Sequence, residues 1–159
     1  DIIHGKNEET ILRPFSSIEV RYHYDLEALV KSLGYDHVHN QITRKNFPTN
    51  VGGSAWIRPR LLYFERSITH EELLEEIDKR GNLRLAVIEE FIAFLRCYPF
   101  LLVGDTEIVA AGSIWNQIKG DNLCRYVPTA YTSGLGRTFY LHPVKLKYHP
   151  NQRFLVVEQ

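Results

Sequence analysis

Histidines and cysteines are the residues of this sequence that could bind a metal ion. His37 and His39 have one residue between them, so an extended segment would place both imidazoles on one face, with Asp36 adjacent. No third and fourth ligand follows at the spacing of a zinc site, and neither Cys97 nor Cys124 belongs to a CxxC pair. We therefore favour loop or solvent-facing histidines over a metal site, and expect no cofactor. We expect two buried or semi-buried free thiols rather than a disulfide or a reactive cysteine.

The sequence motifs of common enzyme classes are absent. There is no GxSxG nucleophile elbow, no HExxH pair and no GxGxxG loop. Gly52-Gly53-Ser54 lacks the lysine that follows in a phosphate-binding loop. The carboxylates between residues 71 and 80 are interspersed with lysine and arginine, which is typical of a solvated helical face. We therefore expect a binding protein and not an enzyme.

The segment 116–152 is rich in Tyr, Asn and His, interspersed with strand-like apolar residues. Tyrosine offers a large contact area with few rotatable bonds, and small polar residues offer adaptable hydrogen bonds. This composition favours a ligand-binding surface, with a polar sheet that has no partner as the alternative. The candidate contact residues are Asn116, Gln117, Asn122, Tyr126, Tyr131, Thr132, Ser133, Tyr140, His142, Tyr148, His149 and Asn151.

Net charge and length narrow the range of partners. The 159 residues carry 19 Lys plus Arg against 19 Asp plus Glu, so no net field attracts nucleic acid or an anionic membrane. No apolar run reaches the roughly 20 residues of a membrane span. The N-terminus has neither the basic nor the apolar part of a secretory signal, and localisation stays open. We expect an unknown ligand, most simply a protein, with no nucleic acid and no membrane span.

The elements that position these residues begin with an arm over 1–15, where no period is visible. Apolar side chains alternate from Ser17 to Tyr24, which predicts a half-buried strand with Tyr24 on its apolar side. Asp25 then caps a short helix, and Gly34 closes it in a left-handed conformation. The expected N-terminal part of the fold is thus a strand followed by a helix.

Residues 35–54 contain Asn, Pro and paired glycines, which predicts irregular structure around a short extended piece at His37–His39. The segment 55–66 has the composition of a strand. Pro59 has no amide hydrogen to donate, so we expect an edge position or a break there.

Two helices follow. Thr69 and Glu72 form a capping box, and Gly81 ends the first helix, whose apolar stripe includes Leu73, Leu74 and Ile77. The second helix is expected at about Leu85 to Cys97. Its apolar residues cover much of its circumference, so it should be buried more deeply than the first.

After Pro99 the helical period disappears and short strand-like segments alternate with turn residues. Helices packed against a largely antiparallel sheet make an α+β domain. The predicted strands are Glu107–Ala111, Ser113–Ile118, Cys124–Val127, Arg137–Leu141 and Arg153–Val157.

The helix at 71–81, the step Arg84-Leu85-Ala86 and the helix beginning at Glu89 resemble the two-helix signature of the C-type lectin fold. The resemblance is greatest to the branch shared with formylglycine-generating enzymes, with Ala111-Gly-Ser-Ile-Trp115 as its Gly-Ser-x-Trp strand. The resemblance implies a C-type-lectin-like module over 55–159, preceded by an N-terminal strand-helix extension over 1–54. It also implies that the closing strand pairs with the strand before the first helix, at about 57–65.

The chain also resembles variable proteins of diversity-generating retroelements from archaea, archaeal viruses and small-genome bacteria. The motifs are Gly34-Tyr-Asp36, Ile42-Thr-x-x-Asn46-Phe-Pro48, Ala111-Gly-Ser-x-Trp115, Arg125-Tyr-Val-Pro128 and Arg153-Phe-Leu-Val-Val157. The resemblance implies a hypervariable region at about 113–152, in which exposed residues are mutated to change ligand specificity. The implied scaffold residues are Gly112, Ser113, Arg125, Pro128, Arg137, Arg153 and Phe154.

The sequence departs from these families in three ways. Their Arg-Leu-Pro step reads Arg84-Leu85-Ala86 here. The sequence has no Glu-Pro-Asn or Trp-Asn-Asp calcium triplet, which argues against calcium-dependent sugar binding. It has no counterpart of the paired catalytic cysteines of formylglycine-generating enzymes. The leading hypothesis is a ligand-binding display protein. The alternatives are a small enzyme or enzyme remnant on the same scaffold, and a plain protein-interaction domain.

Overall fold

The computed structural model describes residues 9–11 and 15–159, and three helices lie in that part of the chain. The helices are α2 (Leu26–Ser32), α3 (His70–Arg80) and α4 (Ile88–Cys97). None of them is long and apolar enough to cross a bilayer. The strands are β1 (Glu9–Ile11), β2 (Ile18–Arg21), β3 (His37–Val38), β4 (Ser54–Ile57), β5 (Pro59–Phe64), β6 (Leu83–Leu85), β7 (Glu107–Val109), β8 (Trp115–Lys119), β9 (Asn122–Ser133), β10 (Gly136–Pro143) and β11 (Gln152–Glu158).

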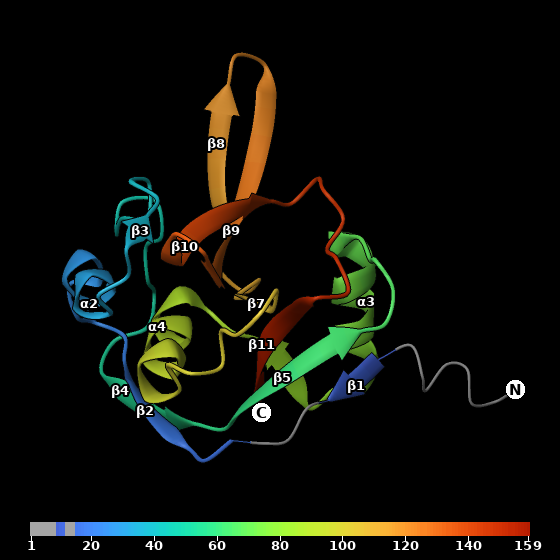
Figure 1. Ribbon diagram of the computed structural model, residues 1–159, viewed down its shortest axis with the longest axis horizontal. Helices are drawn as coiled ribbons and strands as arrows, with labels where there is room; N and C mark the ends of the chain where they lie inside the picture. The colour runs from blue at the N-terminus through green and yellow to red at the C-terminus, as the bar shows by residue number, and fades with distance from the viewer. Residues whose placement is uncertain (1–8, 12–14) are drawn as a thin grey trace, which may run out of the picture.

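Among the described residues, nine strands form one sheet in the order β1-β5-β11-β7-β9-β10-β3, with β6 added beside β11 and β8 beside β9. Strands β2 and β4 form a separate antiparallel pair. Most neighbours in the large sheet are antiparallel, but β7 is parallel to β11 and β3 is parallel to β10. Helices α3 and α4 lie on either side of this sheet (Figure 1). The predicted α+β class is confirmed.

The sheet has a separate core on each face, because neighbouring residues of a strand point in opposite directions. In β5, Leu61 belongs to the core under α4 and Leu62 to the core under α3. Phe91 of α4 is fully buried in the first core, and Leu73 of α3 in the second. Helix α4 is the more deeply buried of the two helices, as predicted.

Strand β11 pairs antiparallel with β5, the strand that precedes α3, with Phe154 opposite Leu62 and Val157 opposite Pro59. The expected pairing of the closing strand is therefore confirmed. Pro59 is the first residue of β5. Strand β4 ends at Ile57, so Arg58 separates the two strands. The break predicted from Pro59 is confirmed as well.

Helices α2 and α3 begin and end where their local signals predict. The Thr69 hydroxyl accepts a hydrogen bond from the Glu72 amide at 3.1 Å, and the Glu72 carboxylate accepts one from the Thr69 amide at 2.8 Å. The Asp25 carboxylate accepts from two amides in the first turn of α2. Gly34 and Gly81 have φ angles of 70° and 69°, the left-handed conformation that glycine adopts without steric cost.

Helix α4 begins later than predicted, because residues 83–85 form strand β6 against β11. The first amide of the helix, at Ile88, donates a hydrogen bond of 2.7 Å to the Ser113 hydroxyl. The Val87 amide donates to the Glu90 carboxylate at 2.9 Å. The start of α4 is thus fixed partly by a side chain 25 residues away, which a local pattern does not contain.

Several local predictions are wrong. The arm expected over 1–15 includes strand β1, which pairs with β5, while residues 1–8 and 12–14 lie outside the described residues. Tyr24 is exposed because β2 has already ended at Arg21. Leu74 is exposed, since Leu73 takes the core-facing position of α3. Both cysteines are free as expected, but Cys97, at the last residue of α4, is exposed rather than buried, and Cys124 is half-buried.

The described part of the predicted extension 1–54 packs into the core under α4. Strand β2 contributes Ile18 and Val20, helix α2 contributes Leu26, and the following loop contributes Ile42 and Phe47. All five side chains are buried beside residues of α4 and of the large sheet. This N-terminal segment therefore shares its core with the module that follows.

The buried Glu90 carboxylate links this segment, through Tyr22, to α4. Glu90 is fully buried and accepts two hydrogen bonds from the Arg84 guanidinium, at 2.9 and 2.6 Å, and one from the Tyr22 hydroxyl at 2.6 Å. Burial and then the bond to Glu90 raise the pKa of the Tyr22 hydroxyl. The neighbouring Glu89 is paired with Arg44 in the same way. Sequence reasoning gave Glu89 and Glu90 no role, because their partners lie elsewhere in the chain.

Candidate functional site

The twelve candidate contact residues occupy three places in the structure and do not form one surface. Four lie on the β8–β9 hairpin, which projects away from the body of the molecule (Figure 1). Three lie at the turn between β9 and β10, at the opposite end of the 12-residue strand β9. A straight strand of this length would measure roughly 36 Å at about 3.3 Å per residue, which is the upper limit of the separation between its two ends. The other five lie in β10 and in the segment before and at the start of β11.

The hairpin presents two different faces, because residues directly opposite each other point to the same side. On one face the opposed pairs are Trp115 with Tyr126, Gln117 with Cys124 and Lys119 with Asn122. On the other face they are Asn116 with Arg125 and Ile118 with Leu123. The predicted contacts Gln117, Asn122 and Tyr126 therefore share the first face, and Asn116 lies on the second.

The second face carries an exposed apolar pair that sequence reasoning missed. Ile118 is 77 % exposed and Leu123 is 61 % exposed, directly opposite each other near the turn. Asn116 beside them is also exposed, while Arg125 at the base of the hairpin reaches toward Glu71 of α3, with 3.9 Å between the charged groups. The candidate contact residues did not include this pair, because they were chosen for polar and aromatic character. Its signal was an apolar residue on each side of the Gly120-Asp121 turn.

The base of the first face is anchored to the body. The rings of Trp115 and Tyr126 lie 5.3 Å apart at 31° and pack against the core under α4. The Lys119 ammonium lies 5.9 Å from the centre of the Tyr126 ring and 3.4 Å from its hydroxyl. Tyr126 is therefore half-buried, and Gln117 and Asn122 provide the more accessible part of this face.

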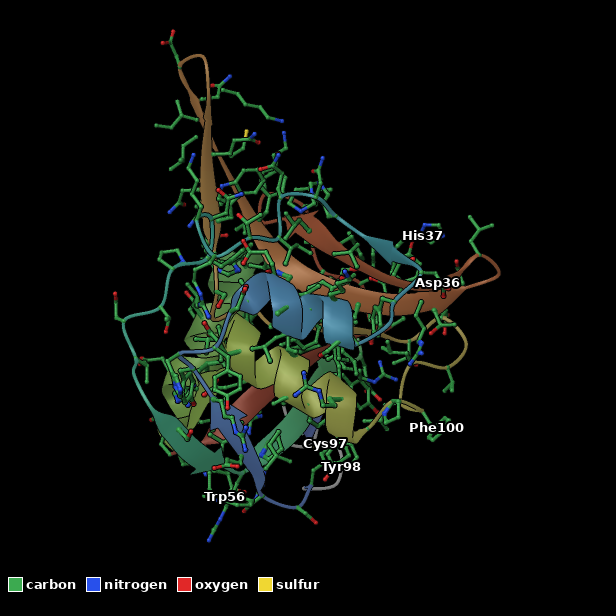
Figure 2. The ribbon with its side chains drawn as sticks, turned by 90° about the vertical axis from the view of Figure 1, so that its left-hand side faces the viewer. Asp36, His37, Trp56, Cys97, Tyr98 and Phe100 are labelled. Atoms are coloured by element: carbon green, nitrogen blue, oxygen red, sulfur yellow. The ribbon has the colours of Figure 1, made fainter. Side chains whose placement is uncertain are left out.

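The β9–β10 turn places Ser133 in solvent and leaves Tyr131 and Thr132 half-buried. The Ser133 hydroxyl accepts a hydrogen bond from the Leu135 amide at 3.1 Å, and the Tyr131 ring lies edge-on to Tyr140 at 5.2 Å. Asp36 holds the other side of the turn, because its carboxylate accepts from the Arg137 amide at 2.9 Å. This turn lies near Asp36 and His37, far from the hairpin tip (Figure 2).

Tyr140, His142 and Tyr148 form an inner cluster with Glu107 and His70. The Tyr140 hydroxyl donates to the Glu107 carboxylate at 2.7 Å, and burial raises the pKa of this hydroxyl. The His142 ring stacks on Tyr148 with 4.9 Å between ring centres, and a hydrogen bond of 2.9 Å joins the Tyr148 hydroxyl to Nδ1 of His70. These side chains satisfy one another within the fold.

The prediction that Tyr148 and His142 contact a ligand from solvent is wrong. Tyr148 is 0 % exposed and His142 is 5 % exposed. The cause is a backbone bridge between Tyr148 and Ile68, with hydrogen bonds of 2.8 and 3.1 Å, which turns the Tyr148 side chain into the core under α3. The polar sequence neighbourhood of Tyr148 predicts exposure, but its partners His70 and His142 come from α3 and β10.

His149 and Asn151 end the candidate set beside the start of β11. His149 is exposed, and its amide donates to the Gln152 side chain at 2.8 Å. The Asn151 side chain donates a 2.6 Å hydrogen bond to the carbonyl of Asp105, so it holds the turn to the loop before β7. Of this pair, only His149 presents its side chain freely to solvent.

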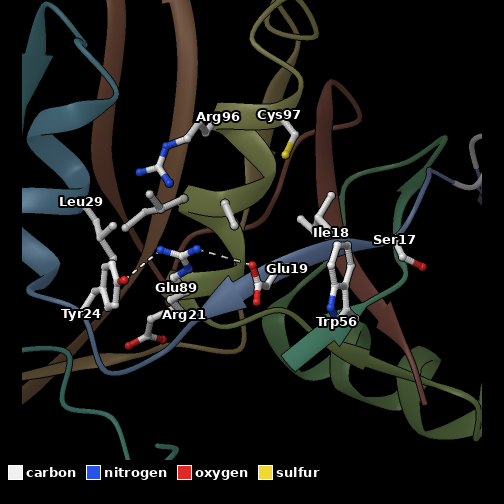
Figure 3. Close-up of a pocket in the computed structure, with 12 residues that line it drawn as sticks. Ser17, Ile18, Glu19, Arg21, Tyr24, Leu29, Trp56, Glu89, Arg96 and Cys97 are labelled. Atoms are coloured by element: carbon white, nitrogen blue, oxygen red, sulfur yellow. Dashed lines mark hydrogen bonds and ion pairs between the residues drawn. The ribbon is translucent and has the colours of Figure 1, made fainter. Parts of the chain in front are cut away.

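A groove of about 490 Å³ lies on another side of the molecule, between β2 and α4 (Figure 3). Arg21 crosses it, donating to the Tyr24 hydroxyl at 2.8 Å and lying 3.7 Å from the Glu19 carboxylate. Trp56 borders the groove and is 69 % exposed. Trp56 and Cys97 lie at the end of the molecule away from the hairpin tip (Figure 2). Of the other charged groups that line the groove, Glu89 is paired with Arg44 and Arg96 donates to the Ser32 hydroxyl at 2.7 Å.

The histidines considered as metal ligands have other partners. Nε2 of His37 lies 3.2 Å from the Leu135 carbonyl oxygen, and Nδ1 of His39 accepts from the Gln41 amide at 3.1 Å. Over residues 9–11 and 15–159, no three His, Cys, Asp or Glu side chains converge as metal ligands. Cys97 at the end of α4 and Cys124 on the hairpin belong to different parts of the fold.

Comparison with known proteins identifies no family for this chain. No protein-family model matches the sequence, and no curated protein or solved structure matches the chain.

Proposed function

We propose that this protein binds a ligand through the β8–β9 hairpin, as the variable protein of a diversity-generating retroelement with a C-type-lectin-like fold. The ligand on this proposal is a protein, and the chain is not an enzyme. The observation that carries the proposal is the hairpin itself, which stands clear of the body and holds apolar and amide side chains in solvent (Figure 1).

The composition of the hairpin suits a protein partner. Protein interfaces combine a few large apolar anchors with a surrounding polar rim. Ile118 and Leu123 supply two adjacent anchors, and Asn116 supplies an amide group on the same face. Gln117 and Asn122 supply amide groups on the opposite face of the hairpin. The proposed contact residues are therefore fewer than the twelve expected from composition. Tyr148 and His142 are excluded because their side chains are buried.

Three of the seven residues assigned to the scaffold, Gly112, Ser113 and Phe154, have contacts within the fold that support the C-type-lectin-like part of the proposal. A side chain added at Gly112 would lie 2.5 Å from the Ala86 carbonyl oxygen, so the close approach of these two segments requires glycine. Ser113 binds the first amide of α4, and Phe154 is buried in the core under α3.

The alternatives receive less support. An enzyme or enzyme remnant would need reactive groups that converge in a cleft, whereas Cys97 and Cys124 lie apart. In the β2–α4 groove Arg21 is paired with Glu19, and Arg96 donates to the Ser32 hydroxyl. A plain protein-interaction domain would use the same hairpin. It differs from the display protein in one respect, which is that its hairpin sequence would be constant among copies of the gene.

Sequencing sibling copies of the gene from one population tests the proposal. Substitutions should concentrate at adenine-templated codons of accessible hairpin positions, including the exposed Asn116 and Asn122 and the half-buried Gln117. They should spare His142 and Tyr148, although these two lie within the same 113–152 interval, because the core depends on them. Exposed positions outside the interval, such as Trp56, are the matched control. Even scatter over exposed residues of the whole chain would leave only the plain interaction domain.

A further inference from the structure

Three buried aromatic side chains that can titrate lie together on the side of the sheet that α3 covers. Tyr148 is fully buried, with the His142 ring stacked on it at 4.9 Å and 23° and the His70 Nδ1 atom 2.9 Å from its hydroxyl. His70 and His142 are both buried. His70 comes from the first residue of α3 and His142 from β10, so the three residues, here named the clasp, join three parts of the chain.

The clasp holds the segment 144–151 against the sheet. Tyr148 exchanges two backbone hydrogen bonds with Ile68, which precedes α3. Nε2 of His142 lies 3.3 Å from the Leu146 carbonyl oxygen, within the same segment. The Val144 amide donates to the Arg125 carbonyl at 2.8 Å, at the base of the hairpin. The segment therefore connects the clasp to the strand that carries the hairpin.

The surroundings of His70 favour the neutral imidazole. Burial lowers the pKa of His70, and the Arg125 guanidinium lowers this pKa further, while the Glu71 carboxylate acts in the opposite direction. His70 also begins helix α3, where the free amides disfavour a cation. Tyr148 faces the same two charged groups, Arg125 and Glu71.

The surroundings of His142 also lower its pKa and so favour the neutral imidazole. Burial is the main cause that lowers the pKa of His142, and His149 on the held segment adds to it. The Leu146 carbonyl and the Glu107 carboxylate oppose this shift. The stack on Tyr148 would also favour a cation, but the pKa of His142 is lowered in sum. Both histidines of the clasp are therefore neutral in the closed structure near neutral pH.

We propose that the clasp is an acid-sensitive closure, which holds the segment 144–151 on the sheet at neutral pH and releases it in mildly acidic solution. Once the segment opens, both imidazoles reach water and bind protons near the ordinary histidine pKa of about 6.5. The open state then binds more protons than the closed state, so falling pH favours opening. Release also removes the Val144 bond at the hairpin base. The closure does not depend on whether the hairpin binds a ligand.

The sign of the pH dependence follows from the lowered pKa values. Above about pH 6.5 both states are neutral, and the closed state has its full stability. As the pH falls from about 6.5 toward the lowered pKa values of the closed state, this stability is progressively lost. Each unit by which a histidine pKa is lowered shifts the opening equilibrium about tenfold.

Amide hydrogen exchange of the whole chain at about pH 7.5 and about pH 5 tests the closure. After correction for intrinsic exchange, amides of 144–151 in the wild type should lose at least about tenfold of their protection at the lower pH. The double variant H70Q/H142Q should show no such pH dependence. H37Q, which changes an exposed histidine of the edge strand β3, should keep the wild-type dependence.

Two results would overturn the closure. One is unchanged protection of 144–151 in the wild type between the two pH values. The other is a pH dependence that persists in the double variant. Should that variant fail to fold, NMR titration of the wild-type histidines decides, because titration of both His70 and His142 at the ordinary histidine pKa contradicts the closure.

Discussion

Tyr148 is a single side chain on which several elements meet. Its ring contacts His142 of β10 and lies at 89° to Phe154 of β11, with 4.9 Å between the ring centres in each case. Its hydroxyl binds His70 of α3. Burial raises the pKa of this hydroxyl, so it remains a neutral partner for His70 at ordinary pH. The residue is therefore part of the core that joins α3 to the sheet.

Replacing Tyr148 with alanine should lower the free energy of unfolding by about 3–5 kcal/mol, because it removes a fully buried ring. The same loss is expected for Phe91→Ala in the core under α4. Tyr148→Phe, which keeps the ring and removes only the bond to His70, should cost about 1–2 kcal/mol. Denaturant unfolding measures all three variants.

Two variants on the surface provide the control for these core changes. Ile118→Ser and Tyr131→Ala should each change the free energy of unfolding by less than about 1 kcal/mol, because exposed and half-exposed positions are usually tolerant. Equal losses at Tyr148 and Ile118 would contradict the separation of core from exposed hairpin.

At the residue scale, exposure was predicted correctly for several small polar residues and for His149, but wrongly for Tyr148 and His142. Asn116, Asn122, Ser133 and His149 are exposed as a polar contact surface requires. Tyr148 was placed wrongly because tyrosine is equally at home in a core and on a surface, and only its partners decide. Those partners lie 78 and 6 residues away, at His70 and His142.

At the scale of elements, Glu90 determines how α4 is held. It accepts from the guanidinium of Arg84, which lies at β6, and from the hydroxyl of Tyr22, which follows β2. It also accepts from the Val87 amide at the start of the helix. One buried carboxylate therefore fixes the start of α4 and two neighbouring strands.

Glu90→Gln should destabilise the fold by about 3 kcal/mol, because it leaves Arg84 without its buried counter-charge. The loss should fall at the lower end of the range for such pairs, since the Arg84 side chain is partly solvated. Arg84→Met in the same background should recover part of it. Thermal unfolding of both variants measures the effect, and a Glu90→Gln variant as stable as the wild type would contradict the assignment.

The difference between the two main helices shows which elements a sequence pattern can predict. The ends of α3 are defined by Thr69, Glu72 and Gly81, all within or beside the helix, and the prediction was correct. The start of α4 depends on Ser113 and on the pairing of β6 with β11. The prediction therefore began that helix about one turn early.

At the scale of the whole molecule, one core contains both the N-terminal segment and the later strands. Side chains of β2 and α2 pack beside Phe91 and Phe139 under the same helix, α4. The α+β class could be predicted because it follows from segment order and apolar patterning, whereas the pairing of the last strand with the one before α3 was implied by the resemblance to the C-type lectin fold. The sequence did not predict this shared core, which depends on contacts across the chain.

The fragment 55–159 should therefore not fold alone, because removal of the N-terminal segment exposes the α4 side of the core. Ile18, Val20, Leu26 and Phe47 would all be missing from it. The fragment should lack near-UV circular dichroism and a cooperative thermal transition. A cooperative transition at a temperature close to that of the full chain would show that the N-terminal segment is dispensable.

The free-standing β8–β9 hairpin has a consequence for how its length can change. Its residues alternate between two faces, and its base is fixed by the stacked Trp115 and Tyr126. Insertion of one residue into a single strand would exchange the faces of every position beyond it, whereas two residues added to each strand would preserve them. Tolerated length variants should therefore differ by even steps per strand, with each step extending the hairpin's reach by about 7 Å.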